Sequence, residues 1–385
     1  MVSHPIQHFC PQYVSFASNP QIEVKVFFGS KLGLVRYTDP NFKTEVSWGN
    51  LNISAFAHEF LNGDAVLLPD KALDAPSLNE ALDIYSPDLL ITYGYFQKLQ
   101  RRASRWAQKN KIPVAYISDS ELRHKREFWK EIIKSVFLRI YFSRISYFLT
   151  VGNANEEFYT ANGVHNHKML RMHFPIDLKS YQDAWQERDK LRRNTRIHYN
   201  IPDHAIVLAV VGKLVSWKSQ DHIIEALKLL EKEEDFFHLF LIGSGEMMES
   251  FKNTVASLSK SRVYFPGFVN IEDLPAYYAA TDIYIHPASK EPHSIAVSEA
   301  IYMGCPVILS NRCGSYGIDD DVQNGKNGYV YDFGNIRQLA DLIKILASNH
   351  AKRKEYGDYA HKIAIKFQHS AHFGIIEDIL NRVAT

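Results

Sequence analysis

Short apolar runs alternate with helical patterns along both halves of the chain. In the first half the runs are 22–28, 88–93, 112–118 and 146–151, each rich in β-branched and aromatic residues. The alternation stops in a polar, charged stretch at 179–203. It restarts with runs at 205–212, 237–243, 262–265, 282–286 and 306–310, and a last strand is expected around 329–331. Strands that alternate with helices are typical of parallel sheets, so the pattern predicts two α/β domains.

The break in the pattern sets the predicted domain boundaries. We expect an N-terminal Rossmann-like domain at 1–178, a linker at 179–203 and a C-terminal Rossmann-like domain at 204–362. Residues 363–385 carry an amphipathic helical pattern, and this helix is long enough to pack across both domains. Two doubly wound sheets that face one another bind ligands in the crevice at the carboxyl ends of their strands.

Composition narrows the class of protein. With 46% hydrophobic and 23% charged residues, the chain has the ordinary composition of a soluble globular protein rather than a disordered one. It lacks an apolar run long enough to span a membrane and a signal-peptide pattern, so a cytoplasmic location is expected. Cys10, Cys305 and Cys313 lack disulfide or zinc spacing, which predicts free thiols and no structural metal.

The net charge of +1 conceals a basic region at 98–144, where thirteen Lys or Arg residues face four Asp or Glu. Within it Phe128, Ile132, Val136 and Ile140, with Phe137 beside them, fall at helical spacing. Two interpretations remain open. The helix lies on an anionic membrane surface, or its apolar stripe packs against its own domain while the cations are solvated, which is the more common arrangement.

The segment 287–300 carries the clearest chemistry. Glu291 and Glu299 stand eight residues apart, after the buried strand 282–286 and on either side of a helix start at Pro292 to Ser294. The amides of a helix N-terminus attract an anion, and carboxylates accept hydrogen bonds from sugar and ribose hydroxyls. The segment therefore predicts a binding site for a nucleotide sugar.

Two lysines follow the first strand of the second domain. Gly212 and Lys213 close this strand, and Lys218 follows in the loop. Fixed cations in a cleft stabilise the charge that develops on a departing diphosphate. Each lysine alone is equally typical of a surface, but together they lie in the loop where such folds bind phosphate. Gly243 and Gly245 end the next strand and allow close backbone approach, although a tight turn without a ligand has the same pattern.

The acidic run at 319–321 is a candidate for a metal-binding pair of aspartates. It lies in a polar stretch rich in Gly and Asn, with no strand directly ahead of it. Charge runs are usually solvated, so we expect a solvated loop and no metal site.

These motifs together resemble glycosyltransferase family 4, a family of retaining enzymes with the GT-B fold. The resemblance rests on VVGKLVSWKSQDHIIEAL (210–227), LFLIGSGEM (239–247), VYFPGFV (263–269), the 291–299 segment, GCPVILS (304–310) and NGKNGYVYDFGN (324–335). The first half also looks like one branch of the family, through SHPIQHFCPQY (3–13), SDSELRHKR (118–126) and VGNANEEFYTANGV (151–164). The implied fold is two Rossmann-like doubly wound domains that face each other across a cleft.

The resemblance also implies residue functions. Lys213 and Lys218 would bind the donor diphosphate, Glu291 would contact the donor sugar, and Glu299 would hold the ribose hydroxyls. The implied donor-binding residues are Gly212, Gly243, Gly245, Gly267 and Phe268 with the backbone amides of His293, Ser294 and Ile295. The candidates on the acceptor side are His4, Gln7, His8, Asp119 and His124, although a structural or surface role is the more common one for each histidine.

The chain departs from the family pattern at three places. Its first strand is several residues shorter than in family members, which suggests a truncated start. The usual Gly-Gly loop of the first domain is replaced by His4 to Gln7, which bears on the acceptor geometry. Finally, His293 and Ser294 stand where an aromatic residue and a glycine are common, so the donor sugar cannot be read from the family.

The resulting hypothesis is a retaining, metal-independent glycosyltransferase. It would move a sugar from a nucleotide diphosphate donor to an acceptor hydroxyl in surface polysaccharide or glycolipid synthesis, with no cofactor. We expect a glycan or lipid-linked acceptor, a cytoplasmic chain with peripheral contact to an anionic membrane, and no nucleic-acid partner. Two alternatives stay open: a nucleotide-sugar epimerase of the same fold, and a non-catalytic nucleotide-sugar-binding subunit.

Overall fold

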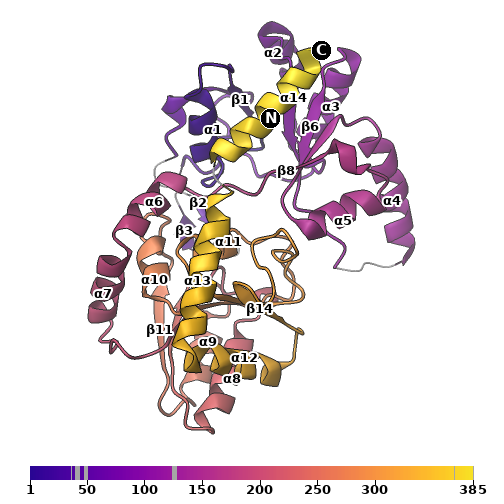
Figure 1. Ribbon diagram of the computed structural model, residues 1–385. Coiled ribbons are helices and arrows are strands. Elements are labelled where there is room, and N and C mark those ends of the chain that lie inside the picture. Colours follow the sequence, from indigo (N-terminus) through magenta and orange to yellow (C-terminus); the bar gives the residue numbers. More distant parts are fainter. Residues whose placement is uncertain (36, 40–43, 47–50, 124–127, 368, 385) are drawn as a thin grey trace.

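The computed structural model describes residues 1–35, 37–39, 44–46, 51–123, 128–367 and 369–384. The chain forms two lobes (Figure 1). The upper lobe in that view holds most of the N-terminal elements together with the last helix, and the lower lobe holds the elements of the second half. Both lobes are built on parallel strands, as the alternation in the sequence predicts.

The C-terminal lobe contains one six-stranded parallel sheet. Its strands are β9 (Val207–Val211), β10 (His238–Ile242), β11 (Arg262–Gly267), β12 (Ile283–His286), β13 (Val307–Ser310) and β14 (Gly328–Tyr331). All six coincide with predicted strands. The order is β11-β10-β9-β12-β13-β14, so the sheet grows in one direction from β9 and in the other from β12. The point between β9 and β12 is the topological switch point, where open α/β sheets bind ligands.

Helices cover both faces of this sheet. They are α8 (Asp221–Glu231), α9 (Met248–Val255), α10 (Leu274–Ala280), α11 (Ile295–Tyr302), α12 (Ile336–Ser348) and α13 (His350–Ile365), with the 3-10 turn η3 (Ser216–Lys218). Successive residues of β9 enter opposite cores: Val207 and Ala209 join one, Leu208 and Val210 the other. A sheet buried on both faces needs uninterrupted apolar strands, which is why these strands read as short apolar runs.

The N-terminal lobe has a divided sheet. Strands β5 (Leu90–Tyr93), β6 (Val114–Ile117), β7 (Tyr147–Thr150) and β8 (Met169–Arg171) are parallel neighbours, and β1 (Lys25–Phe28) pairs with β4 (Ala57–Phe60). A bridge joins Val2 to Phe28, and the Met1 amine donates to the Ile91 carbonyl at 2.8 Å. The sequence predicts β1, β5, β6 and β7. It does not predict β4, β8 or the hairpin of β2 (Tyr37–Asp39) and β3 (Thr44–Val46).

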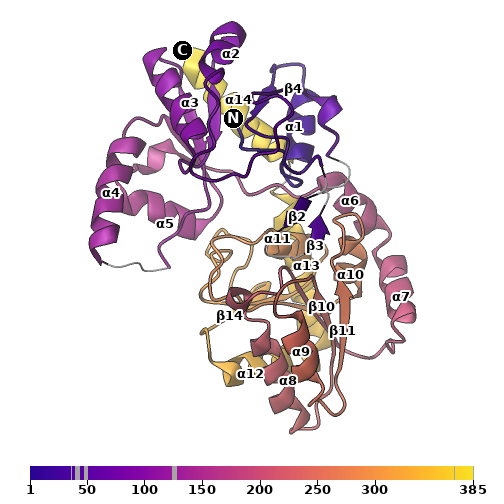
Figure 2. The same cartoon turned by 180° about the vertical axis from the view of Figure 1, so that it is seen from behind.

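Helices surround the N-terminal sheet. They are α1 (Cys10–Ala17), α2 (Leu78–Tyr85), α3 (Lys98–Lys109), α4 (Phe128–Phe142) and α5 (Asn153–Ala161), with the 3-10 turns η1 (Ile53–Ala55) and η2 (Asn166–Lys168). The last helix, α14 (His369–Ala384), returns to this lobe (Figure 2). Its Ile376 and Ile379 pack in one core with Ile117 and Leu149. The end of the chain therefore links the C-terminal lobe to the N-terminal sheet.

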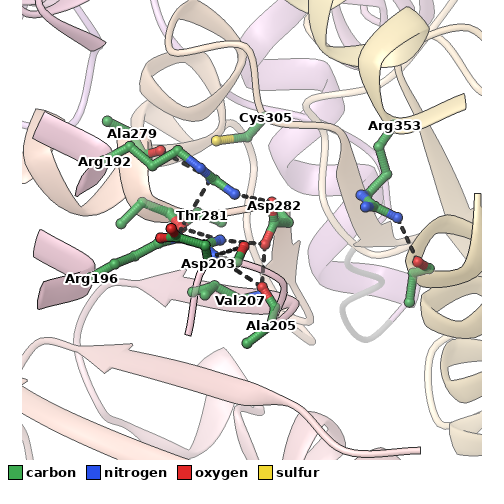
Figure 3. A network of polar contacts seen from close by, with 12 residues as sticks. Arg192, Arg196, Asp203, Ala205, Val207, Ala279, Thr281, Asp282, Cys305 and Arg353 are labelled. Carbon is green, nitrogen blue, oxygen red and sulfur yellow. Dashed lines mark hydrogen bonds and ion pairs between the residues drawn. The ribbon is translucent and has the colours of Figure 1, made fainter. Parts of the chain in front are cut away.

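The polar stretch at 179–203 is not an extended linker. It forms most of α6 (Leu178–Gln186) and all of α7 (Arg188–His198), which lie along the C-terminal lobe. The buried Arg196 fastens α7 in place: it donates to Asp282 Oδ2 at 2.6 Å and to the carbonyls of Ala280 and Ala205 (Figure 3). Asp282 Oδ2 also accepts the Val207 amide at 2.8 Å. Two charges of this stretch, Arg192 and Arg196, thus join Asp282 in a largely buried network, while others such as Lys179 and Lys190 are exposed.

The structure also bears on the cysteines and on the possibility of a membrane-spanning helix. The three cysteines are free and buried, which confirms the expected thiols. In the part of the chain that the structure describes, every helix is too short or too polar to cross a bilayer.

Candidate functional site

Lys218, Glu291 and His286 meet at the switch point of the C-terminal sheet. Lys218 ends η3, in the loop after β9, and its ammonium contacts Glu291 Oε2. His286 ends β12, and its Nε2 lies 3.3 Å from the same oxygen. Strands β9 and β12 are the two central neighbours of the sheet, so the loops at their carboxyl ends converge there. The structure therefore brings Lys218 and Glu291 into contact, although their part in donor binding stays a prediction.

Glu291 is held in its ionised form. Burial alone raises the pKa of this carboxyl, but the hydrogen bond from His286 and the positive charge of Lys218 outweigh it and lower the pKa to about 2. The same burial lowers the pKa of His286, so the imidazole is neutral near pH 7 and donates its Nε2 proton to the carboxylate. Glu291 can accept hydrogen bonds or face a cation, but it has no proton to donate at neutral pH.

Glu299 has the opposite electrostatic state. It lies in the middle of α11, almost fully buried, and accepts a hydrogen bond from the Tyr278 hydroxyl at 2.9 Å. Burial raises its pKa to about 7, although the tyrosine bond opposes the shift. Two glutamates eight residues apart therefore differ by about five units in pKa. Of these two glutamates, Glu299 is the one that changes its charge near neutral pH.

Glycines allow the loops around the site to touch. A Cβ on Gly243 would lie 1.9 Å from the Gly212 carbonyl oxygen, and one on Gly245 would lie 2.3 Å from the Leu214 carbonyl oxygen. The loops after β9 and β10 are also joined by a 2.9 Å hydrogen bond from the Leu214 amide to the Ser244 carbonyl. Close approach, rather than a tight turn alone, is why glycine occupies these two positions.

Lys213 and the residues after β11 complete this edge of the sheet. Lys213 follows β9, and its carbonyl accepts a hydrogen bond from Gln220 at 2.9 Å, which fixes the backbone of the loop. Gly267 ends β11 with a φ of 77°, and its carbonyl accepts the Gly243 amide at 2.8 Å. Phe268 follows it directly. The glycines and lysines predicted for donor binding thus all lie on loops at one edge of the sheet.

The start of α11 differs from the prediction in one detail. Ser294 is the N-cap residue and Ile295 the first helical residue, as the sequence indicates. However, the Ser294 amide already donates to the Ser315 hydroxyl at 2.8 Å. A phosphate at this helix start would therefore have to compete with Ser315 for the Ser294 amide.

The His293 side chain lies against the boundary between the lobes. Its Nε2 is 3.2 Å from Asp321 Oδ2, and its ring meets Phe174 of the preceding lobe edge-on at 5.5 Å. The side chain is almost fully buried. Burial lowers the pKa of His293, but the hydrogen bond to Asp321 and the charges of Asp321 and Asp320 outweigh it, so the pKa is raised. The imidazole therefore faces the Asp321 carboxylate, and this contact favours its protonated form.

The expectation of a solvated loop at 319–321 is wrong for two of its three aspartates. Asp320 and Asp321 are fully buried. Asp320 Oδ2 accepts the Asn153 amide of the other lobe at 2.7 Å, and Asp321 Oδ2 accepts the Ser298 hydroxyl at 2.6 Å. These carboxylates bond to groups distant in sequence, which a reading of local charge cannot reveal. With His173, their ligand atoms lie within 4.8 Å of one another, the spacing of a metal-binding group.

The acceptor-side candidates of the N-terminal lobe divide into three groups. Asp119 follows β6, and burial raises its pKa above the usual value, with smaller contributions, opposite in sign, from the charges of His293 and Glu291 in the donor segment. His4 and His8 flank Gln7 in the first loop, and burial lowers the pKa of His4 to about 4. His8 lies 6.3 Å from Phe174, ring to ring. His124 lies outside the described residues.

Arg123 joins the loop after β6 to the C-terminal lobe. Its Nη1 donates to the Cys313 carbonyl at 2.8 Å, and its guanidinium lies over the Tyr316 ring at 4.3 Å. The Gly314 amide in turn donates to the Glu291 carbonyl at 2.8 Å. A short chain of contacts therefore connects the acceptor-side loop to the donor segment.

Sequence reasoning missed His286, Tyr278 and Asp321 as parts of the site. His286 had a signal, since it is the polar residue that ends an apolar strand five positions before Glu291. Tyr278 had none, because it contacts Glu299 across 21 residues.

Comparison with known proteins agrees with the geometry. Residues 192–363 match the model of the family described as Glycosyl transferases group 1. Spore coat protein SA of Bacillus subtilis is 31% identical over 199 residues, which is 49% of this chain and 52% of that protein. The chain thus spans about half the length of this curated relative. Several further relatives are named glycosyltransferases, and together these matches support the glycosyltransferase class.

Solved structures share the whole architecture. A glycosyltransferase from Rickettsia africae has a TM-score of 0.71 at 14% identity, with 100% of this chain and 97% of that one covered. Anabaena HepE, solved with UDP and glucose, has a TM-score of 0.67 at 17% identity, with 99% of each chain covered. At this identity the likeness shows the fold, and it confirms the predicted GT-B arrangement of two Rossmann-like lobes.

Proposed function

We propose that this protein transfers a sugar from a nucleotide diphosphate sugar to an acceptor hydroxyl. The observation that carries the proposal is the meeting of Lys218 and Glu291 at the switch point, directly before the start of α11. A cation, a fixed carboxylate and a helix N-terminus form one site suited to a phosphate that carries a polyhydroxylated sugar. The UDP and glucose bound to HepE, which has the same fold, support this choice of ligand.

The chemistry assigned to the site is stabilisation of the leaving group. As the bond from the anomeric carbon to the diphosphate breaks, negative charge grows on the phosphate oxygens. Lys213, Lys218 and the amides at the start of α11 oppose that charge, so they contribute more to the transition state than to the bound donor. These fixed charges serve the purpose that a metal ion serves in other transferases, and the proposal includes no metal step.

Glu291 is a positioning residue for the sugar in this proposal. With a pKa of about 2 it stays ionised, accepts hydrogen bonds from sugar hydroxyls and orients Lys218. Its state at neutral pH excludes general acid catalysis by this group. Following the family resemblance, the acceptor attacks from the face that the diphosphate leaves, and the departing phosphate receives the acceptor proton. The product would then retain the configuration of the anomeric carbon.

Glu299 and Asp119 are assigned to the nucleotide and to the acceptor, respectively. Glu299 would accept hydrogen bonds from the ribose hydroxyls in its ionised form, and Asp119 would face the acceptor. The acceptor class that we propose is a glycan or lipid-linked sugar of surface polysaccharide or glycolipid synthesis, with the chain in the cytoplasm and in peripheral contact with an anionic membrane.

Incubation with a panel of UDP-, GDP- and ADP-sugars, with and without glycan and lipid-linked acceptors, tests the proposed reaction. We expect nucleoside diphosphate release that depends on one acceptor, and a product whose anomeric proton coupling in NMR shows the donor's configuration. Conversion of the donor sugar without any acceptor would establish an epimerase instead. Tight donor binding without turnover across the acceptor panel would indicate a binding subunit.

A further inference from the structure

One face of α4 exposes a continuous stripe of large apolar side chains. Its members are between 44% and 63% exposed and recur at intervals of three and four residues: Trp129, Ile132, Ile133, Val136, Phe137 and Ile140. On a helix with 3.6 residues per turn these positions cover an arc of about 140°. Exposed apolar patches of this kind on water-soluble lobes usually mark an interaction surface.

The opposite face of α4 anchors the helix to its lobe. Leu138 and Phe142 are buried, and the Phe142 ring packs against Phe148 at 5.2 Å and Tyr159 at 5.5 Å. Of the two interpretations left open by the sequence, packing of the whole stripe against its own domain does not hold. Ile132, Val136 and Ile140 are largely exposed, whereas Phe137, although 44% exposed, also packs against Tyr95 at 5.9 Å and Tyr141 at 6.1 Å.

Exposed cations lie on the same helix and on its neighbour. Arg139 and Arg144 are exposed near the end of α4. The neighbouring α3 is joined to α4 by the 3.0 Å bond between Ser104 and Tyr141, and carries Arg105 in an exposed position. The whole region 98–144 holds thirteen basic residues against four acidic ones. An apolar stripe bordered by arginines fits a surface with an apolar interior and anionic headgroups.

The same charge argues against a second copy of this chain as the occupant. Two α4 faces placed against each other would bring like charges together around the contact, which is unfavourable at low salt. An anionic lipid surface supplies the missing negative charge and accepts the apolar side chains at once.

The position of α4 relates this surface to the site. The helix forms the outer edge of the N-terminal lobe in both views (Figures 1 and 2). It follows the loop that carries Asp119 and Arg123, and Arg123 contacts the C-terminal lobe through Cys313. We infer that α4 docks on anionic lipid headgroups through this stripe and so presents the Asp119 loop to a lipid-linked acceptor. This inference rests on the proposed function: it names the surface of the membrane contact proposed there, and the choice of acceptor follows from the same proposal.

Co-sedimentation with vesicles tests the docking. The full chain is mixed with vesicles of phosphatidylcholine alone, or of phosphatidylcholine and phosphatidylglycerol at a ratio of about 7 to 3, in low salt. We expect binding to the mixed vesicles and a partial loss of binding in high salt, since only the charge contribution is screened. Ile133→Glu together with Val136→Glu should weaken binding by at least about tenfold, because two charges would enter the apolar contact. Arg139→Gln should weaken it by about fivefold.

Ile84→Glu is the matched control. Ile84 is 78% exposed on α2 of the same lobe, so this variant adds a charge to another helix and should bind vesicles like the wild type. The absence of vesicle binding by the folded wild-type chain, or equal binding by the double variant, would overturn the inference. A wild-type dimer that the double variant converts to a monomer, without lipid binding, would assign the face to a second copy instead. The affinity of the double variant for the nucleotide-sugar donor, measured without acceptor, should equal that of the wild type. This measurement separates failure of docking from failure of the proposed reaction.

Discussion

Lys218 and Glu291, 73 residues apart in the chain, are joined in an ion pair across the switch point of the C-terminal sheet. Both side chains are largely buried, with exposed fractions of 19% and 15%. Breaking a buried pair by removing one partner leaves an uncompensated charge. In the proposed reaction a phosphate oxygen of the donor becomes a second partner for Lys218. The pair thus holds the lysine in the position where the leaving group needs a cation.

Replacing Glu291 separates positioning from acid–base catalysis. Because its pKa is about 2, Glu291 stays ionised from pH 5 to pH 9 and adds no limb to the pH dependence of kcat. Glu291→Gln should therefore lower kcat on the order of a hundredfold without changing the shape of that profile. Steady-state rates across this pH range provide the measurement, with the exposed Glu272→Gln as control. If one limb of the profile disappeared in the variant, Glu291 would be a proton donor or acceptor after all.

The stability of the protein should depend on Glu299 between pH 4.5 and pH 7. An unfolded glutamate loses its proton near 4.5, whereas burial raises the folded pKa of Glu299 to about 7. Between these values the folded state keeps a proton that the unfolded state has lost, so the contribution to the free energy of unfolding falls as pH rises, by about 3 kcal/mol in total.

Glu299→Gln should remove this dependence. Urea unfolding at pH 5 and pH 8 should show the variant gaining stability relative to the wild type at the higher pH. The nucleotide affinity of the wild type should rise over the same range, since only the carboxylate accepts two ribose hydroxyl protons. An equal difference between variant and wild type at both pH values would contradict the raised pKa.

Substitution of Gly243 should disturb the site through the backbone. Its φ of 134° and the 1.9 Å approach of a Cβ to the Gly212 carbonyl oxygen leave no room for Gly243→Ala without movement of the β9 loop. We expect a loss of at least about 2 kcal/mol in the free energy of unfolding, with weaker donor binding. Gly374→Ala is the control, since that glycine lies exposed in α14 with open space around it. It should gain about 0.5 to 1 kcal/mol. Equal stabilities of the two variants would contradict the close approach.

Arg196 should dominate the attachment of α7. It is 1% exposed and bonds to Asp282 and to several carbonyls, so Arg196→Ala leaves those carbonyls unpaired and Arg192 as the remaining cationic partner of Asp282. We expect a cost of about 2 to 4 kcal/mol in the free energy of unfolding. The exposed Arg193 on the same helix provides the comparison, and Arg193→Ala should change stability by less than about 0.5 kcal/mol. Chemical denaturation of both variants gives the difference, and similar values would show that the network is not stabilising.

The sequence predicts well those strands and loop residues whose positions are determined by their immediate neighbours in the chain. The central strands of the C-terminal sheet are buried on both faces, so each of them is an apolar run that stands out from its neighbours. The glycines and lysines after β9 and β10 follow such runs directly, and their common edge is a consequence of parallel topology. By contrast, β4 has the mixed sequence Ala-His-Glu-Phe, which carries no such signal.

The parts that escape prediction depend on partners far away in the chain. The local sequence around Asp320 predicts a solvated residue, but its carboxylate accepts the amide of Asn153, which lies 167 positions earlier in the chain. His293 looks like a donor contact by position in its segment, but its ring bonds to Asp321 and meets Phe174. The outer face of α4 is a similar case, since its spacing is the same whether the stripe is buried or exposed.

The most direct test of the site is donor binding by Lys218→Ala, measured by calorimetry and thermal unfolding against the panel of UDP-, GDP- and ADP-sugars. The wild type should bind one donor and gain about 2.7 kcal/mol of stability at a hundred times the dissociation constant. Lys218→Ala should bind that donor at least about tenfold more weakly and turn it over about a hundredfold more slowly. Lys228→Ala, which removes a surface lysine paired with Glu225, should match the wild type. Binding and turnover of Lys218→Ala within a few fold of the wild type would contradict the assignment of this lysine to the leaving diphosphate.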